Sequence, residues 1–229
     1  FIKKENKIEK YFELFIGDGA FFFYLKQNYE IKKSYIFDIN RELILGYKVI
    51  QYNPEDLIEI LQDLQKKYLR KSDKQREIFF YEIRNHYNEQ IKKIDYENFN
   101  NDWIERTALL IFLNKTCFNG LFRQNKNGEF NVPFGGYENP KIADENNICA
   151  VNKALIDTEI FCLDFSSALD MIDENSFVYL DPPYRPLNKT SSFTDYSKEG
   201  FTDTDQKRLS NFYKRADKNG AYLMLSNSD

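Results

Sequence analysis

Asp181 begins the run Asp-Pro-Pro-Tyr, whose residue types could hold an amino group for reaction. An exocyclic amino group on a nucleobase is a weak nucleophile, because its lone pair is delocalised into the ring. A carboxylate that accepts one N–H and a main-chain carbonyl that accepts the other would localise that lone pair. Asp181 offers the carboxylate, and Pro182 offers a carbonyl whose direction is restricted because Pro183 follows it. Tyr184 offers a flat face for a base swung out of a duplex.

Because an ionised carboxylate is a weak base, we expect Asp181 first to stabilise positive charge on the nitrogen as the new bond forms. The proton can leave once the nitrogen is cationic. The four residues therefore predict a catalytic site for a conjugated amine. The other interpretation is a rigid exit from the apolar strand before them.

A second candidate is the turn in FELFIGDGA, where Gly17 and Gly19 permit close approach by a ligand. Asp38 lies nineteen residues beyond Gly19, at the end of the next apolar run, where a carboxylate can accept both hydroxyls of a ribose. The turn lacks the third glycine of the dinucleotide fingerprint. The pattern therefore favours a compact nucleoside cofactor without a pyrophosphate, and a nicotinamide oxidoreductase is the weakest contender.

A third candidate is the pair Asp164-Phe165, which follows another apolar run. The carboxylate and the ring could hold the amino group and the face of an adenine. Alternatively, Asp164 caps a helix that begins near Ser166.

Five short apolar runs predict the strands that carry these residues, and helical patterns lie between several of them. The predicted strands are 11–15, 34–38, 159–163, 177–180 and 221–226, and the predicted helices of this part are 20–29, 40–51 and 202–218. Strand and helix in alternation predict an α/β fold with a parallel sheet. Ligands bind at the carboxyl ends of such strands, which is where the glycine turn and the three acids lie.

About 120 residues between the second and third strands interrupt this alternation. Helical patterns cover 55–70, 74–90 and 102–114, and a loop-rich stretch with four of the nine glycines follows. We therefore predict a sheet-bearing domain over 1–52 and 141–229 and a mostly helical insertion over 53–140.

Charge is distributed unevenly over these parts. The net charge is −4, but residues 66–126 hold 13 Lys and Arg against 8 Asp and Glu, which is +5 and leaves −9 for the remainder. The middle could face nucleic acid, although a solvated helical surface has the same composition.

Composition excludes several classes of protein. No apolar run approaches the roughly 20 residues that span a bilayer, and the first residues lack the apolar segment of a signal peptide, so we expect no membrane association and a cytoplasmic location. Three scattered cysteines and one histidine predict neither a disulfide framework nor a metal site.

The motifs together resemble those of the DNA adenine methylase (Dam) family of N6-adenine methyltransferases, which use S-adenosylmethionine. FELFIGDGA is similar to the family's cofactor loop, FDIN to its ribose-binding acid, DPPY to its catalytic motif, and RPLNKTSSFTDYSKEGF to the segment beyond it. The stretch NKTCFNGLFRQNKNGEFNVPFG resembles the DNA-contacting region of members that recognise GATC.

This resemblance implies a Rossmann-like S-adenosylmethionine-dependent methyltransferase sheet with a helical DNA-recognition insertion. The implied cofactor-binding residues are Phe15, Gly17, Gly19, Asp38, Asp164, Phe165 and Asp181, and the target adenine would be received by Asp181, Pro182, Pro183 and Tyr184. Phe118 stands where the family places an aromatic wedge in the base stack, Arg123 would read a guanine, and Asn119, Leu121 and Pro133 would line the same surface. The family begins with a segment resembling KWAGGK and continues into a hairpin after the fifth strand, so we expect a domain incomplete at both ends.

The resulting hypothesis is an enzyme, encoded by a prokaryote or phage, that methylates adenine N6 in double-stranded DNA within GATC after base flipping. A cognate restriction endonuclease in the same system is an expected but not physically required partner. The alternatives are methylation of cytosine N4 or of an RNA base, and a non-catalytic DNA-binding fragment.

Overall fold

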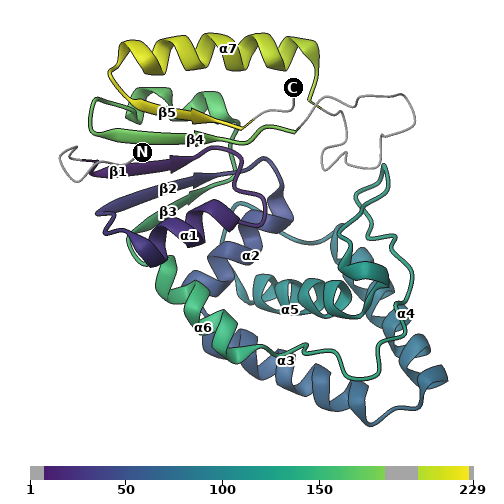
Figure 1. Cartoon of the computed structure of the whole chain (residues 1–229). Coiled ribbons are helices and arrows are strands. Elements are labelled where there is room, and N and C mark those ends of the chain that lie inside the picture. Colours follow the sequence, from purple (N-terminus) through teal and green to yellow (C-terminus); the bar gives the residue numbers. More distant parts are fainter. Residues whose placement is uncertain (1–7, 184–200, 227–229) are drawn as a thin grey trace. The chain divides into compact units, whose positions relative to one another are not determined.

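The computed structural model describes residues 8–183 and 201–226. The chain forms two compact units, which are described separately. The sheet unit comprises the residues up to Ile44 and those from Ala154 onward, and the helical unit is Leu45–Lys153 (Figure 1).

The sheet unit is built on five parallel strands in the order β3-β2-β1-β4-β5. These strands are β1 (Lys10–Glu13), β2 (Lys33–Phe37), β3 (Thr158–Phe161), β4 (Ser176–Leu180) and β5 (Tyr222–Leu225). All five predicted strands are confirmed, with ends that differ by one or two residues. Because β2 and β4 lie on opposite sides of β1, the strand order reverses between β1 and β4, and ligands bind beyond the carboxyl ends of strands at such a point.

Helices cover both faces of this sheet because side chains alternate along each strand. Phe12 and Leu14 belong to the core formed with η2 (Phe165–Met171) and α7 (Asp203–Lys218). Tyr11 points to the other face, where its ring lies 6.4 Å from that of Phe22 in α1 (Ala20–Asn28). Figure 1 shows α1 and α7 on opposite sides of the sheet. The predicted α/β, Rossmann-like architecture is confirmed.

The helical unit packs around α5 (Asn101–Thr116), whose buried residues include Trp103, Phe112 and Leu113. Helices α3 (Pro54–Leu69) and α4 (Asp73–Gln90) both pack on α5. The three helices predicted for the insertion are confirmed. Helices α2 (Arg41–Tyr52) and α6 (Glu145–Ala154) supply Leu45 and Ile148 to the same core, so this compact unit extends beyond 53–140 on both sides.

Helix α6 was not predicted, because its sequence ENNICAVNKA is short and mostly polar and buries only Ile148. Within the described ranges, no helix combines the length and the apolar character that crossing a membrane requires.

Candidate active site

The glycine turn and Asp38 are joined directly at the carboxyl edge of the sheet, by which we mean the residues that follow β1, β2, β3 and β4. The Gly17 backbone N–H donates to Asp38 Oδ2 at 3.2 Å, and the Asn40 N–H donates to Oδ1 at 2.8 Å. Burial raises the pKa of Asp38, and these backbone hydrogen bonds partly offset that effect. The carboxylate is thus held at the edge by the backbone of the turn and of its own strand exit.

Both glycines of the turn have a left-handed backbone, with φ of 49° at Gly17 and 74° at Gly19. A Cβ at Gly17 would meet no heavy atom within 4 Å, so the space beside it is open. Gly19 is the N-cap of α1, and its N–H donates to the Ile16 carbonyl at 2.7 Å. The turn therefore combines an open approach with a helix N-terminus, an arrangement suited to a polar ligand.

Asp181 and the prolines follow β4 directly. Asp181 is half-buried, Pro182 is buried and Pro183 is exposed, while Tyr184 lies outside the described residues. The structure thus places the carboxylate beside the strand-order reversal, at the same edge as Gly17 and Asp38.

Glu13, at the end of β1, is a buried acid that the sequence analysis did not single out. It lies opposite Tyr179 of β4, two residues before Asp181, and the Tyr11 hydroxyl donates to its carboxyl group. Burial raises the pKa of Glu13 to about 8; the carboxylates of Asp181 and Asp18 also raise it, while hydrogen bonds from Tyr11 and the Phe22 backbone lower it. Burial and the Glu13 carboxyl raise the pKa of Tyr11 in turn. The Glu13 carboxyl group therefore keeps its proton near neutral pH.

Asp164 and Phe165 follow β3 at the same edge. Asp164 caps η2 by accepting the Ser166 N–H at 3.0 Å, as the alternative interpretation predicted. The Phe165 ring is only 2% exposed, and it packs against Phe15 at 5.4 Å and Phe201 at 6.3 Å. Phe15 and Phe165 thus form the wall behind the edge, and Phe201 completes it.

Two apolar side chains beside these acids are also exposed. Ile39 follows Asp38 and is 60% exposed, and Leu163 precedes Asp164 and is 46% exposed. Large apolar groups left open next to polar acceptors are typical of a ligand site. The signal that could have identified them is their position directly beside the strand-terminal acids.

The residues predicted to contact DNA lie on one loop of the helical unit, residues 117–137. All five are exposed: Phe118, Asn119, Leu121, Arg123 and Pro133. Phe118 and Leu121 are 52% and 46% exposed although both are large and apolar. Exposed apolar side chains grouped with an arginine are typical of a recognition surface.

Buried residues and backbone pairing anchor this loop. The Phe118 N–H donates to the Pro133 carbonyl at 2.9 Å, and Phe130 is buried while its backbone bonds to the Asn88 side chain in both directions. A Cβ at Gly135 would lie 2.5 Å from the Cys117 carbonyl oxygen, so only glycine fits there. The Arg123 Nε donates to Asn131 Oδ1 at 2.8 Å, and Nη2 donates to the Asn131 carbonyl at 3.2 Å.

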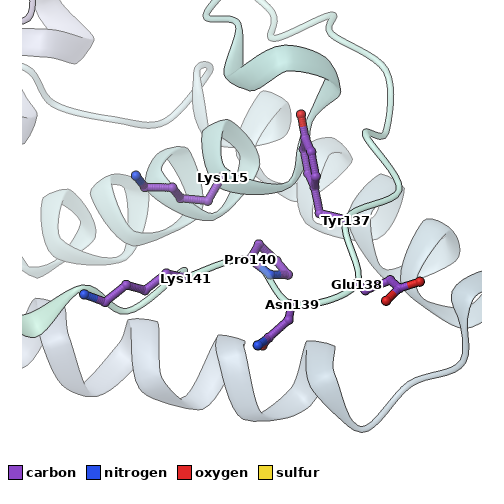
Figure 2. Close-up of a pocket in the computed structure, with 6 residues that line it drawn as sticks. All are labelled: Lys115, Tyr137, Glu138, Asn139, Pro140 and Lys141. Carbon is purple, nitrogen blue, oxygen red and sulfur yellow. The ribbon is translucent and has the colours of Figure 1, made fainter.

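A cavity of about 310 Å³ adjoins the loop in the helical unit (Figure 2). It is lined by Lys115, Tyr137, Glu138, Asn139, Pro140 and Lys141. The Tyr137 hydroxyl accepts the Asn119 backbone N–H at 3.2 Å, which links the cavity wall to the exposed segment. Lys115 and Lys141 extend to the same side in Figure 2. Lys141 Nζ lies 2.7 Å from Asp144 Oδ1, and Lys115 is exposed.

Comparison with known proteins agrees with this geometry. The chain matches the family model described as D12 class N6 adenine-specific DNA methyltransferase over residues 1–229. The type II methyltransferase M.MjaIII of Methanocaldococcus jannaschii is 51% identical over 225 residues, which are 98% of this chain and 75% of that protein. M1.LlaDCHI of Lactococcus lactis subsp. cremoris, also a type II methyltransferase, is 39% identical over 97% of this chain and 73% of its own length. The DNA adenine methylase of Vibrio cholerae is 31% identical over 95% of this chain and 72% of its own length.

These matches confirm the predicted resemblance to the Dam family and the prediction of an enzyme. The chain belongs to the D12 class of N6-adenine-specific DNA methyltransferases.

Proposed function

We propose that this enzyme transfers the methyl group of S-adenosylmethionine to N6 of an adenine flipped out of double-stranded DNA, within GATC. The observation that carries the proposal is the carboxyl edge of the sheet. There Asp181-Pro182 follows β4 beside the strand-order reversal, next to a glycine turn that is hydrogen-bonded to Asp38.

The residues at this edge fit an adenosine-bearing cofactor. Asp38 would accept the ribose hydroxyls, because its carboxylate is fixed in place by two backbone N–H groups. Open space at Gly17 admits the chain of atoms that joins the ribose to the reacting methyl group. Asp164 would accept a hydrogen bond from the amino group of the cofactor's base. When bound, the cofactor supplies a methyl group activated by its positively charged sulfonium.

Asp181 and the Pro182 carbonyl would each accept one N–H of the target amine, which localises the lone pair on nitrogen. As the new C–N bond would form, the bond from the methyl group to sulfur would break and leave a neutral thioether. The target nitrogen would become cationic, and the Asp181 carboxylate would stabilise that charge. The excess proton then leaves through Asp181. Tyr184, which lies outside the described residues, would stack on the flipped base.

Sequence recognition is assigned to the 117–137 loop. Phe118 would insert where the adenine leaves the stack, and Arg123 would donate two hydrogen bonds to a guanine edge in the major groove. Asn119, Leu121 and Pro133 would line the same contact. GATC is proposed because the 31% identical Vibrio cholerae relative is named a DNA adenine methylase and because the loop resembles that of GATC-recognising members.

Phosphate contacts would position the enzyme without reading sequence. Lys115 beside the cavity in Figure 2 offers such a contact, and the +5 excess over residues 66–126 supplies more positive charge in the helical unit. Since two similar relatives are type II methyltransferases, we also propose a role beside a restriction endonuclease of the same system.

The test is incubation of the protein with methyl-labelled S-adenosylmethionine and duplexes that contain GATC, a permuted GTAC site or no such site. Nucleosides are then separated after digestion. We expect label only in N6-methyladenine from the GATC duplex. Label from GTAC alone would overturn the GATC assignment, and label in cytosine would overturn the proposed substrate. DNA binding without cofactor binding would indicate the non-catalytic alternative. Family membership favours adenine N6 over cytosine N4.

A further inference from the structure

The two oxygens of the Asp164 carboxylate have different surroundings. Oδ1 accepts the Ser166 N–H at 3.0 Å, the Ser166 hydroxyl at 2.5 Å and the Arg208 Nη2 at 2.6 Å. Oδ2 accepts no hydrogen bond from any residue in 8–183 or 201–226. The carboxylate is therefore fixed through one oxygen while the other stays available.

Arg208 reaches Asp164 from α7, far along the chain. Its Nη1 donates to Asp205 Oδ1 at 2.9 Å, so the guanidinium bridges two carboxylates. Asp205 is itself fixed, because its other oxygen accepts the Thr202 N–H at 3.0 Å and the Thr202 hydroxyl at 2.6 Å in the capping box of α7. The guanidinium also lies over the Phe165 ring, 5.1 Å from its centre. Contacts with two carboxylates and one ring thus hold this side chain.

A planar guanidinium makes such a bridge with a more defined geometry than a lysine ammonium. Arginine presents parallel donors in a rigid fork and stacks on an aromatic ring, whereas a lysine ammonium is a single point of charge on a flexible stem. Nη1 and Nη2 donate to different carboxylates here, and the guanidinium carbon lies 5.1 Å from the centre of the Phe165 ring. The arrangement fixes the direction of Asp164 more firmly than the helix cap alone.

We propose that Arg208 is a positioning residue for the cofactor site: it holds Asp164 through Oδ1 so that Oδ2 accepts a hydrogen of the exocyclic amino group on the cofactor's purine ring. The inference rests on the proposed cofactor function of this edge. The proposal also predicts which purine the cofactor site prefers. A hydrogen-bond acceptor at Oδ2 favours binding of a purine with a 6-amino group and disfavours one with a 6-oxo group, which is itself an acceptor. Arg208 touches neither the cofactor nor the methyl group.

The test compares calorimetric binding of two probes, S-adenosylhomocysteine and its 6-deamino analogue, in which hydrogen replaces the amino group. The variants are Arg208→Ala, Arg208→Lys and, as a matched control on the same helix, Arg215→Ala. Arg215 is exposed and forms no ion pair with a described residue. Thermal melting of each variant reports whether it is folded.

For Arg208→Ala we expect affinity for S-adenosylhomocysteine to fall about 10-fold, because a hydrogen bond to a charged acceptor is misaligned. Affinity for the deamino analogue, which the wild type already binds more weakly, should change less than about 2-fold. Arg208→Lys should recover part of the loss, and Arg215→Ala should bind both probes as the wild type does.

Equal losses for both probes would show that Arg208 only supports the fold, and unchanged binding of S-adenosylhomocysteine would show that it does not position Asp164. Either result overturns the inference alone. Failure of the wild type to bind S-adenosylhomocysteine would instead overturn the proposed function on which the inference rests.

Discussion

At the carboxyl edge of the sheet unit, acids are held by backbone groups and by other side chains, as when Asp38 accepts from Gly17 and Asn40. In the 117–137 loop of the helical unit, Phe118 and Leu121 are about half exposed, whereas Phe130 of the same loop is buried and hydrogen-bonded to Asn88. The two regions face different demands. Chemistry on an amine needs acceptors that are fixed before the substrate arrives. Reading DNA needs side chains that can reach base edges.

The largest effect is expected at the edge, for Asp181→Asn. Because the asparagine side chain has no charge with which to stabilise the cationic nitrogen, we expect methyl transfer to fall by about 10³-fold or more, a loss typical of removing electrostatic stabilisation. DNA affinity, measured by fluorescence anisotropy, should be unchanged, since recognition is assigned to the other unit.

Asp170→Asn is the matched control for this substitution, because Asp170 is an exposed acid in the same unit and lies in η2. Its methyl transfer should match that of the wild type. Retention of methyl transfer by Asp181→Asn would contradict the assignment of Asp181, and a joint loss of DNA binding would contradict the division of labour between the two regions.

Glu13→Gln tests whether burial raises the pKa of the Glu13 carboxyl group at the carboxyl edge. The folded pKa of Glu13 is about 8, against 4.5 for an ordinary glutamate, so below pH 4.5 both folded and unfolded chains carry the proton. Between these values only the folded chain keeps it. The protonated Glu13 carboxyl group therefore makes its full contribution to the free energy of unfolding below pH 4.5. This contribution is lost, by up to about 1.4 kcal/mol per pH unit, as the pH rises to 8.

Urea unfolding at pH 5 and pH 8.5 measures this contribution. Glutamine keeps an oxygen that can accept from Tyr11 but cannot ionise, so the variant should gain stability over the wild type at pH 8.5 relative to pH 5. Glu129→Gln is the matched control, because Glu129 lies in the loop and is only partly buried. Parallel pH profiles for Glu13→Gln and wild type would contradict a buried, protonated Glu13.

Arg123→Ala is the corresponding test of the loop. Loss of a bidentate contact to guanine costs about 1–3 kcal/mol of discrimination. We therefore expect kcat/KM on GATC to fall about 10- to 100-fold while activity on duplexes with that guanine replaced changes little.

Lys126→Ala in the same loop is the control, because a phosphate contact would affect all sequences alike. Binding of S-adenosylhomocysteine should be unchanged in both variants. A variant Arg123→Ala that loses activity equally on matched and substituted duplexes would show that Arg123 positions the DNA backbone and does not read a base.

Most of the fold followed from local patterns. Strand and helix positions could be predicted because apolar periodicity and capping residues such as Thr202 and Asp205 act over a few residues. The edge acids Asp38, Asp164 and Asp181 could be located because parallel strands place their carboxyl ends together.

Contacts between distant segments could not be predicted in the same way. Arg208 is 44 residues from Asp164 along the chain. Its pair with Asp205 is local, three residues apart on α7, but nothing in the sequence of α7 indicates that the Arg208 guanidinium also reaches Asp164. Glu13 sits in an apolar strand pattern as a single acid, and its environment depends on Tyr11 and on the exit of β4. The sequence also did not indicate that the Phe165 ring packs against Phe15, Phe201 and Phe212, which come from three different segments.

The smallest effect is expected from Lys115→Ala, which asks whether charge acts differently in the two units. Lys115 is exposed beside the cavity in Figure 2, and removing one phosphate contact should weaken binding of every duplex a few-fold and reduce the slope of log affinity against log salt by about 1. Lys214→Ala, an exposed lysine on α7 of the sheet unit, should leave that slope unchanged. Anisotropy titrations at three salt concentrations measure both slopes. Equal slope changes would mean that phosphate contacts extend over both units, because counterion release depends on where the charge meets DNA.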